Sequence, residues 1–402
     1  MKIDNKKGIT AVKGFSVSCA AAEVKYKDRN DLLLISSDVP ANAAGVFTLN
    51  KVKAESLLLC EEIIKTNGTY SHVIVNSGNA NACTGKAGME GAKAVVAAVA
   101  KETGCTDKEV LIASTGVIGE PFPADRIVAS LPKLTKNAGK NDEIECAKAI
   151  MTTDTYPKVS STSVTIDGVT VSIGGISKGA GMIAPNMGTM LGFICTDAKI
   201  ETPLLKELTK DAVNHSFNRI TIDGDTSTND TVLLLANGKA DVTIHTNSEG
   251  IKAFKDALLA VCIDLAKMIV KDGEGATKLV NVIVKDAFSV PDALTIAKKI
   301  ANSPLVKTAI HGEDPNWGRI LGAAGNTGIP FQYEKSSLWI GDVQILKNGE
   351  LIKGYNENDA NKAMKDAEYD ITLSCGSGFH TANIWTTDFS KEYISINADY
   401  RS

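Results

Sequence analysis

The fold class of this chain is decided by one stretch, Ser163-Val-Thr-Ile-Asp167-Gly168-Val-Thr-Val-Ser-Ile173. Two runs rich in Val, Ile and Thr flank the dipeptide Asp167-Gly168, which is typical of a two-residue hairpin turn. Such a turn joins two antiparallel strands directly, whereas a strictly alternating doubly wound sheet needs a helix between successive strands. We therefore expect an α/β protein with mixed sheets.

The clearest helical pattern lies at residues 251–271. Apolar side chains recur there at helical spacing, at Ile251, Phe254, Leu258, Val261, Leu265, Met268 and Ile269. The stretch Asp272-Gly273-Glu274-Gly275 ends this helix, and the apolar run Leu279–Val284 after it is expected to form a strand. Further helices are expected at residues 52–66, 86–102, 204–217, 291–302 and 357–368. Further strands are expected at Leu32–Ser36, His72–Asn76, Thr231–Leu235, Leu338–Leu346, Asp370–Leu373 and Ala382–Thr386.

The composition is that of an ordinary globular protein. Of the 402 residues, 44% are hydrophobic and 22% are charged, which argues against disorder and fibrous repeats. The net charge is −4 and no run of Lys or Arg exceeds two residues, so neither a nucleic acid nor a membrane is an expected partner. The length suggests two domains, or one large domain with a long appendage. We expect a main domain at 1–276 and a C-terminal α/β domain at 277–402.

The N-terminal residues and the cysteines both indicate a cytoplasmic protein. The segment Met1-Lys-Ile-Asp-Asn-Lys-Lys-Gly8 carries charges where a secretion signal needs an apolar core. Eight cysteines lie singly along the chain, without a C-x-x-C pair and without histidines clustered beside them. That spacing favours free thiols over a disulfide framework or a zinc site, so no metal is expected.

One tempting pattern is Gly175-Ile-Ser177-Lys-Gly179, which matches the nucleophile elbow of serine hydrolases. The elbow needs a helix directly after it. The following residues, Ala180-Gly-Met-Ile-Ala-Pro185, contain a glycine and a proline where that helix should run. We therefore reject the elbow and expect no catalytic role for Ser177.

Three other patterns are also better explained without a ligand. The tract Asp223–Asp230 begins like a calcium loop but lacks the Gly at position six and the Glu at position twelve, so a structural turn is expected. The segment His311–Asp314 has no second histidine at ligand spacing and is expected to be a polar loop. The glycine-rich tracts Gly174–Gly181 and Gly322–Gly328 lack the G-K-[ST] ending of a phosphate loop.

The informative tract is Lys178-Gly-Ala-Gly181-Met-Ile-Ala-Pro185-Asn-Met-Gly188-Thr189-Met-Leu-Gly192-Phe193. Small residues surround a threonine, as a self-cleaving junction requires, because the Thr189 hydroxyl must reach back to the Gly188 carbonyl. Cleavage would free the α-amino group of Thr189. That amine has an ordinary pKa of about 8, so part of it is neutral near pH 7 and can take the proton of its own hydroxyl.

The same tract resembles the signature of the ornithine acetyltransferase family, the glutamate N-acetyltransferases of arginine biosynthesis. Further stretches resemble blocks of that family in the same order, at Ala43–Thr48, Asn76–Ala82, Ser114–Gly119, Met151–Thr155, Asp272–Gly275, His311–Arg319 and Asn397–Ser402. The resemblance covers essentially the whole chain. Several blocks in one order are more specific than any single motif.

The resemblance implies roles for particular residues. Thr189 would be the nucleophile and the new N-terminus, and Thr115 and Gly116 would stabilise the oxyanion. Gly188 and Thr189 would form the cleavage site. The implied substrate contacts are Thr152, Lys178, Thr189, Glu274, Asn397 and Ser402, and by inference Lys178 would meet a carboxylate and Glu274 an ammonium group. The chain departs from many family members in having Gly188 for Ala and Ser402 for Thr, and both changes keep the size or the hydroxyl.

The family's reaction is a ping-pong transfer of an acetyl group from N2-acetylornithine to glutamate through acetyl-Thr189. It needs no organic cofactor, and the sequence leaves open whether acetyl-CoA also serves as an acetyl donor for N-acetylglutamate synthesis. The implied fold is a layered α/β sandwich shared with self-processing aminopeptidases. The implied assembly is an α2β2 heterotetramer of the cleaved chains 1–188 and 189–402.

Two alternatives stay open at this point. One is an aminopeptidase of the same fold, in which water resolves the acyl-enzyme. The other is a non-catalytic protein that binds amino acids on the same scaffold. Cleavage of the chain and acceleration of ornithine release by glutamate distinguish the transferase from both.

Overall fold

The computed structural model describes residues 2–66, 68–184, 190–330 and 332–399. The chain divides into two compact units. Unit 1 comprises Met1–Gly179, Pro185–Asn218 and Asp225–Ile269, and unit 2 comprises Ala180–Ala184, Arg219–Gly224 and Val270–Ser402. The main boundary lies a few residues before the one expected after residue 276, and the two short segments that join unit 2 have no counterpart in the sequence prediction.

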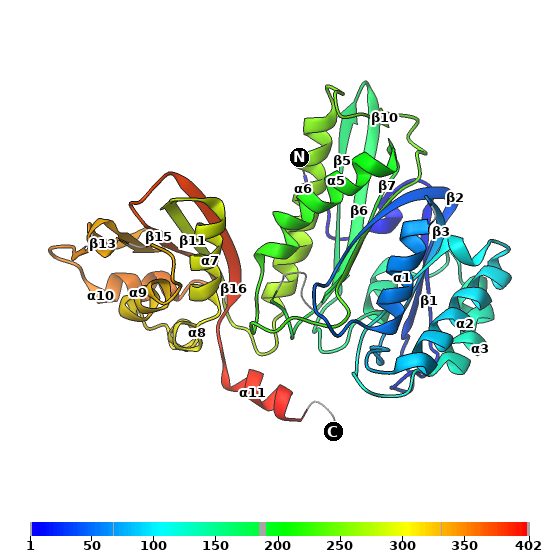
Figure 1. Cartoon of the computed structure of the whole chain (residues 1–402), viewed down its shortest axis with the longest axis horizontal. Helices are drawn as coiled ribbons and strands as arrows, with labels where there is room; N and C mark the ends of the chain where they lie inside the picture. Colours follow the sequence, from blue (N-terminus) through cyan, green and yellow to red (C-terminus); the bar gives the residue numbers. More distant parts are fainter. Residues whose placement is uncertain (1, 67, 185–189, 331, 400–402) are drawn as a thin grey trace. The chain divides into compact units, whose positions relative to one another are not determined.

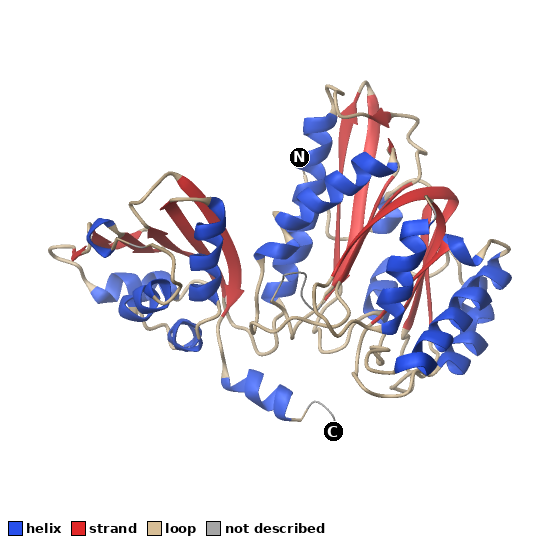
Figure 2. Cartoon of the chain, in the orientation of Figure 1, coloured by secondary structure: helices blue, strands red, loops and turns tan. Residues whose placement is uncertain are grey.

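Unit 1 is built on an eight-stranded mixed sheet (Figures 1 and 2). Its strands are β1 (Phe15–Ala20), β2 (Leu32–Phe47), β3 (Thr69–Asn76), β4 (Val110–Ser114), β5 (Lys158–Ile166), β6 (Val169–Lys178), β7 (Leu191–Thr196) and β9 (Thr231–Ala236). The order is β4-β3-β2-β9-β7-β6-β5, and β1 pairs with β2 outside this path. The pairs β3/β4 and β7/β9 are parallel and the other pairs are antiparallel. The prediction of mixed sheets is confirmed.

The hairpin of β5 and β6 is the stretch that the sequence singled out. Ile166 pairs with Val169 across Asp167 and Gly168, whose φ angles of +51° and +79° are those that a two-residue hairpin turn requires. The pairing extends beyond the predicted residues, as far as Lys158 opposite Ser177. This length places Lys178 at the end of β6.

Helices pack on the sheet of unit 1. They are α1 (Glu55–Thr66), α2 (Gly85–Thr103), α3 (Ala124–Lys136), α4 (Glu143–Ala149), α5 (Thr202–Asn214) and α6 (Ile251–Lys271), whose last two residues belong to unit 2. Helix α1 packs on β4 and β2, α5 packs on β2 and β9, and α2 packs against α3. A two-stranded sheet of β8 (Lys199–Ile200) and β10 (Thr243–Ile244) completes the unit.

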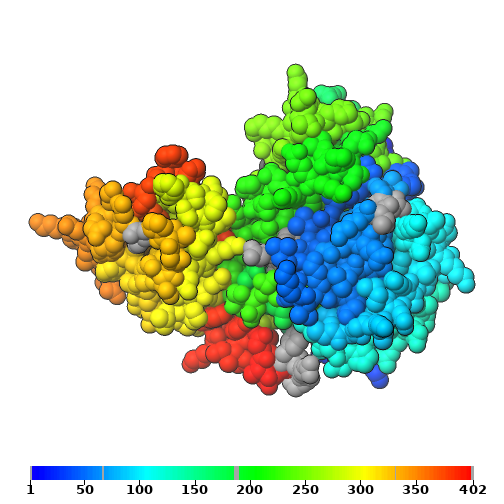
Figure 3. All heavy atoms as spheres, viewed as in Figure 1, coloured from blue at the N-terminus to red at the C-terminus, as the bar shows by residue number. Residues whose placement is uncertain are grey.

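Unit 2 contains a six-stranded mixed sheet. Most of the unit forms the yellow to red part of the surface in Figure 3. Its strands are β11 (Leu279–Ala287), β12 (Ser337–Ile340), β13 (Val343–Lys347), β14 (Glu350–Leu351), β15 (Glu368–Ser374) and β16 (His380–Thr387), in the order β14-β13-β12-β15-β11-β16. Its helices are α7 (Val290–Ala301), α8 (Pro304–His311), α9 (Trp317–Gly325), α10 (Glu357–Met364) and α11 (Lys391–Ala398). Helix α7 packs on β11 and β16 over a core of buried Val, Ile and Ala side chains.

Two predicted elements differ from the structure in an instructive way. The strand expected at Leu338–Leu346 is a hairpin, β12 and β13, because Gly341 turns the chain with φ +55°. The helix expected at residues 357–368 ends at Met364, since the Ala367 carbonyl accepts the backbone N–H of Leu279 at 2.8 Å and the chain then enters β15. In the second place a long-range pairing overrides a local pattern, whereas in the first a local turn divides the predicted strand.

Candidate active site

The structure brings three of the implied site residues together in unit 1. Lys178 lies at the end of β6 with its side chain almost fully buried. Its Nζ lies 3.2 Å from Oγ1 of Thr115 and 2.9 Å from Oγ1 of Thr152. An ammonium group can only donate, so both hydroxyl oxygens accept from Lys178 and their own O–H bonds are directed to other partners. Lys178 therefore orients Thr115 as a donor.

The backbone beside Thr115 suits the second oxyanion donor. Thr115 follows β4 directly, and its N–H donates to the Asn76 carbonyl at 3.0 Å. Gly116 has φ +133°, and a Cβ there would lie 2.3 Å from the carbonyl carbon of Gly78, so the position requires glycine. The N–H of Gly116 follows directly after Thr115 in the chain. A side-chain hydroxyl and a neighbouring backbone N–H are the kinds of donor that an oxyanion hole uses.

Behind Lys178 lies a buried carboxylate, Asp154. Its Oδ1 accepts from Nζ of Lys158 at 2.8 Å and from the N–H of Gly179 at 2.6 Å. Its Oδ2 accepts from the N–H of Thr152 at 3.0 Å and lies 3.8 Å from Nζ of Lys178. Burial alone would raise the pKa of Asp154, but Lys178 and Lys158 outweigh burial and hold that pKa well below its ordinary value. Asp154 is therefore a permanent anion at the base of the site.

Sequence reasoning missed Asp154 and Lys158 as site residues. Asp154 stands in the block Met151–Thr155 that carried part of the family resemblance, but nothing in that block gave it a role. Lys158 is the first residue of strand β5, and its side chain is fully buried. The sequence offered no clear signal for Lys158, because the residues that follow it, Val159-Ser-Ser-Thr162, form no apolar pattern that would mark it as buried.

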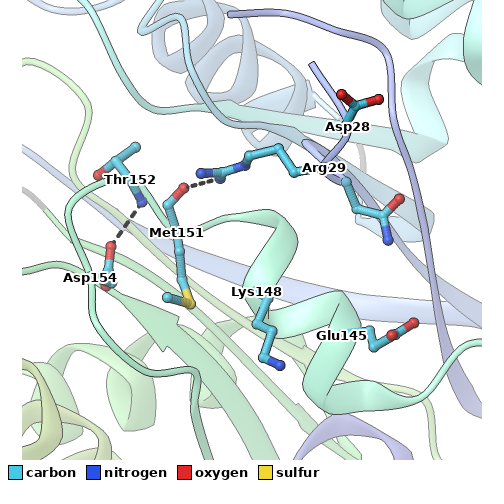
Figure 4. Close-up of a pocket in the computed structure, with 8 residues that line it drawn as sticks. Asp28, Arg29, Glu145, Lys148, Met151, Thr152 and Asp154 are labelled. Carbon is cyan, nitrogen blue, oxygen red and sulfur yellow. Dashed lines mark hydrogen bonds between the residues drawn. The ribbon is translucent and has the colours of Figure 1, made fainter. Parts of the chain in front are cut away.

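A pocket of about 400 Å³ adjoins this group. Thr152 and Asp154 line it, together with Asp28, Arg29, Asn30, Glu145, Lys148 and Met151. Figure 4 shows Arg29 donating to the Met151 carbonyl and the N–H of Thr152 donating to Asp154. The lining carries both signs of charge, as a site for a zwitterionic amino acid requires.

A second pair of implied residues meets in unit 2. Asn397, on α11, donates from Nδ2 to Oε2 of Glu274 at 2.7 Å. Glu274 is buried, and its N–H donates to the Ala180 carbonyl at 2.8 Å. A Cβ at Gly181 would lie 2.5 Å from the Glu274 carboxylate, so a larger residue there would require that carboxylate to move. The C-terminal helix thus contacts a carboxylate that the resemblance assigns to the substrate site.

The remaining implied residues, Gly188, Thr189 and Ser402, lie outside the described residues. The first described residue after the junction is Met190. Its side chain is buried, and its N–H donates to Oδ1 of Asp230 at 2.9 Å.

The patterns that the sequence analysis set aside carry no catalytic geometry. Ser177 is buried inside β6, and residues 179–184 form no helix after it, so the rejection of the elbow is confirmed. His311 pairs through Nδ1 with Oδ2 of Asp388 at 2.7 Å. Among the described residues no three His, Cys, Asp or Glu side chains are grouped so as to hold a metal ion. The described helices include none that is long and apolar enough to span a membrane.

Comparison with known proteins identifies the family of this chain. The sequence matches the profile of the ArgJ family over residues 16–402. The chain belongs to the ArgJ family. It is 46% identical over 392 residues to the arginine biosynthesis bifunctional protein ArgJ of Geobacter sulfurreducens, with 97% of this chain and all of that relative covered. The protein of the same name from Rhizobium meliloti is 45% identical, with 98% of this chain and 96% of the relative covered.

A solved structure of an ArgJ protein also resembles this chain. The arginine biosynthesis bifunctional protein argJ of Bacillus halodurans is 42% identical with a TM-score of 0.51, and the match covers 53% of this chain and 100% of that one. The resemblance found in the sequence is thereby confirmed, and the layered α/β fold with mixed sheets agrees with it.

Proposed function

We propose that this ArgJ-family protein transfers the acetyl group of N2-acetylornithine to glutamate in arginine biosynthesis, through an acetyl-Thr189 intermediate. The observation that carries the proposal is the placement of Lys178, which donates to the hydroxyls of both Thr115 and Thr152. This leaves the Thr115 O–H and the Gly116 N–H to stabilise negative charge on an acyl carbonyl oxygen.

The proposed chemistry balances in two half-reactions. The Thr189 hydroxyl oxygen attacks the acetyl carbonyl of N2-acetylornithine, its proton passes to the α-amine of Thr189, and ornithine leaves with that proton as its amine re-forms. The α-amine of glutamate then attacks the acetyl-threonine ester, so that N-acetylglutamate forms and the hydroxyl of Thr189 is restored. Both tetrahedral intermediates place their oxyanion at Thr115 and Gly116.

Each unit carries a charged residue that suits these substrates. Lys178 offers a cation to a substrate carboxylate, and Glu274, held by Asn397, offers an anion to an ammonium group. No organic cofactor enters the scheme. Acetyl-CoA enters as an alternative acetyl donor, which would make the enzyme both a glutamate N-acetyltransferase and an amino-acid N-acetyltransferase; the word bifunctional in the names of the relatives supports this.

Self-cleavage between Gly188 and Thr189 is part of the proposal. The match to the solved chain from Bacillus halodurans covers all of that chain and 53% of this one. Residues 189–402 also make up 53% of the 402 residues. This agreement in length supports a processed β chain. The α2β2 assembly and the cytoplasmic location stay predictions.

Intact-mass analysis of the purified protein, followed by kinetics, tests the proposal. We expect chains 1–188 and 189–402, and we expect glutamate to accelerate ornithine release. A cleaved enzyme whose ornithine release ignores glutamate would be the hydrolase of the same fold. An uncleaved chain that binds ligand without turnover would be the binding protein.

A further inference from the structure

The loop that follows β4 in unit 1 carries the two proposed oxyanion donors, the Thr115 hydroxyl and the Gly116 N–H. The peptide that joins Ser114 to Thr115 is held at both of its polar groups. Its N–H donates to the Asn76 carbonyl at 3.0 Å, and its carbonyl accepts from Nδ2 of Asn229 at 2.8 Å. The orientation of this peptide plane is therefore fixed from two sides.

The backbone after Gly116 is held as well. The N–H of Val117 donates to the Gly78 carbonyl at 3.3 Å, and the Val117 carbonyl accepts from the N–H of Ala80 at 2.9 Å. Peptide units are planar, so a peptide can turn only through the two soft dihedral angles of each neighbouring residue. The peptide that carries the Gly116 N–H lies between two fixed planes and has little freedom to turn.

Asn229 is buried, and both ends of its side-chain amide are hydrogen-bonded. Besides Ser114, its Nδ2 donates to the Ala80 carbonyl at 2.6 Å, and its Oδ1 accepts from the Thr228 hydroxyl at 2.5 Å. Two carbonyls facing one end of the amide identify that end as the nitrogen, because a carbonyl cannot donate. Asn229 thus joins Ser114 to the same residue, Ala80, that binds the Val117 carbonyl.

Both asparagines around this loop come from stretches that the proposed reaction does not otherwise use. Asn229 belongs to the tract Asp223–Asp230, for which a structural turn was expected, and Asn76 opens the block Asn76–Ala82. Loss of a buried amide that donates to two backbone carbonyls leaves both carbonyls unsatisfied, so the backbone around them has to shift.

We propose that Asn229 is a positioning residue for the oxyanion hole, and that its amide holds the backbone so that the Thr115 hydroxyl and the Gly116 N–H point at the acyl oxygen. The inference rests on the proposed acetyl transfer, because it takes these two groups as the oxyanion donors. Asn229 acts through them and does not touch the substrate. Misplacement of a catalytic group by about 1 Å can cost about 10²-fold in rate, so a side chain behind the hole can govern kcat.

Steady-state transfer kinetics test this role, with rates expressed per cleaved chain as counted by intact-mass analysis. Asn229→Ala should lower kcat by about tenfold to a hundredfold with KM little changed, because the donors act on the transition state. Asn229→Asp keeps the shape, but an ionised carboxylate only accepts, so this variant should lose at least as much kcat. Asn229→Ser keeps one donor and should lose less, and it serves if Asn229→Ala does not fold.

The matched control is Asn237→Ala. Asn229 lies shortly before β9 and Asn237 directly after it, so the two asparagines stand at opposite ends of one strand. Nδ2 of Asn237 also donates to a backbone carbonyl, that of Lys13 at 3.0 Å. Asn237→Ala should lower the midpoint of thermal unfolding and leave kcat at the wild-type value.

Binding of a tetrahedral analogue gives a readout that a merely structural role would not change. In a methylphosphonamidate analogue of N2-acetylornithine, an anionic phosphoryl oxygen stands where the oxyanion forms. Asn229→Ala should weaken the binding of this analogue by about the factor by which it lowers kcat/KM. The binding of ornithine, which lacks the acetyl group, should stay within about twofold of the wild type.

The outcomes separate the positioning role from the proposed function. A reduced kcat in Thr115→Ala with a normal kcat in Asn229→Ala would overturn the positioning role and leave the oxyanion hole intact. Equal losses of kcat in Asn229→Ala and Asn237→Ala would also overturn it, by showing that general destabilisation suffices. A normal kcat in Thr115→Ala would overturn the oxyanion hole and the positioning role together. A wild-type enzyme that moves no acetyl group to glutamate would overturn the proposed function itself.

Discussion

Asp154 and Lys158 form an ion pair with no exposed surface, in which Oδ1 of the carboxylate lies 2.8 Å from Nζ of the ammonium. A buried pair of this kind recovers its desolvation cost only when further hydrogen bonds satisfy the charges. Here the N–H groups of Thr152 and Gly179 provide them. The pair thus fixes two backbone positions beside Lys178, which links the stability of unit 1 to the geometry of the proposed oxyanion site.

Replacing Asp154 should therefore impair both stability and catalysis. Asp154→Asn leaves the ammonium of Lys158 buried without its counter-charge, which typically costs about 3 to 5 kcal/mol of unfolding free energy. Urea unfolding measures this loss, and transfer kinetics should show a reduced kcat. The double variant Asp154→Asn with Lys158→Met removes both charges and should recover stability without recovering kcat. Recovery of kcat as well would show that Asp154 has only a structural role.

The same carboxylate predicts a pH dependence of stability. The folded state holds the pKa of Asp154 below its ordinary value, so its contribution is fully present above about pH 4 and is lost as the pH falls toward the folded pKa. The difference in unfolding free energy between the wild type and Asp154→Asn should accordingly shrink as the pH is lowered from 5. A difference that stays constant down to pH 3 would contradict this prediction.

Thr115 should act mainly on the chemical step. Thr115→Ala removes a donor whose interaction strengthens as charge develops on the acyl oxygen, which typically reduces kcat by about 10² to 10³. Thr115→Ser keeps the hydroxyl and should retain most of the activity. An unchanged kcat with a raised KM in Thr115→Ala would make Thr115 a binding residue instead.

Local patterns predicted much of the fold because those elements depend on neighbouring residues. The turn at Asp167-Gly168 and the apolar stripe of residues 251–271 needed no distant contact to be recognised. The sequence analysis missed strands β1, β4 and β7 but predicted β9, which is as short as β7 and also buried throughout, so burial alone does not separate the missed strands from the predicted ones.

The site was predictable only in part, for a similar reason. Resemblance to a family supplied Thr115 and Lys178, but their contact joins residues 63 positions apart and depends on the order of strands in the sheet. Asp154 carries no pattern that distinguishes it from a surface carboxylate. Its role becomes visible only once Lys158 and Lys178 are placed beside it.

Lys307 in unit 2 predicts a second pH effect, in which stability again rises with pH but over an alkaline range. Its side chain is fully buried, and burial lowers the pKa of Lys307 to about 7, against the opposing effect of Asp388 and Asp223. Between pH 7 and the ordinary lysine pKa of about 10.4, the unfolded chain binds a proton that the folded chain does not, so stability from this group rises with pH. The slope should reach about 1.4 kcal/mol per pH unit.

Lys307→Met tests this effect. The unfolding free energy of the wild type relative to Lys307→Met should increase as the pH rises from 7 to 10. The variant also leaves Thr386 and the Thr387 carbonyl without the lysine donor, which shifts the whole curve but not its slope. A pH-independent difference would mean that Lys307 keeps its proton in the folded protein.

The C-terminal helix should contribute to transfer and much less to folding. Asn397 holds Glu274 through a 2.7 Å hydrogen bond, although α11 has no fully buried side chain and chain ends usually tolerate change. Asn397→Asp places a second carboxylate against Glu274 and should reduce transfer more than Asn397→Ala does, because like charges repel and the amide donor is lost as well.

Deleting Tyr400–Ser402 should leave the fold and cleavage largely intact while impairing transfer through loss of substrate orientation. Steady-state kinetics with N2-acetylornithine and glutamate, beside intact-mass spectra, measure the two effects separately. Normal kinetics in both Asn397→Asp and the truncated enzyme would show that the C-terminus is a tail without a role in the site, and would remove Asn397 and Ser402 from it.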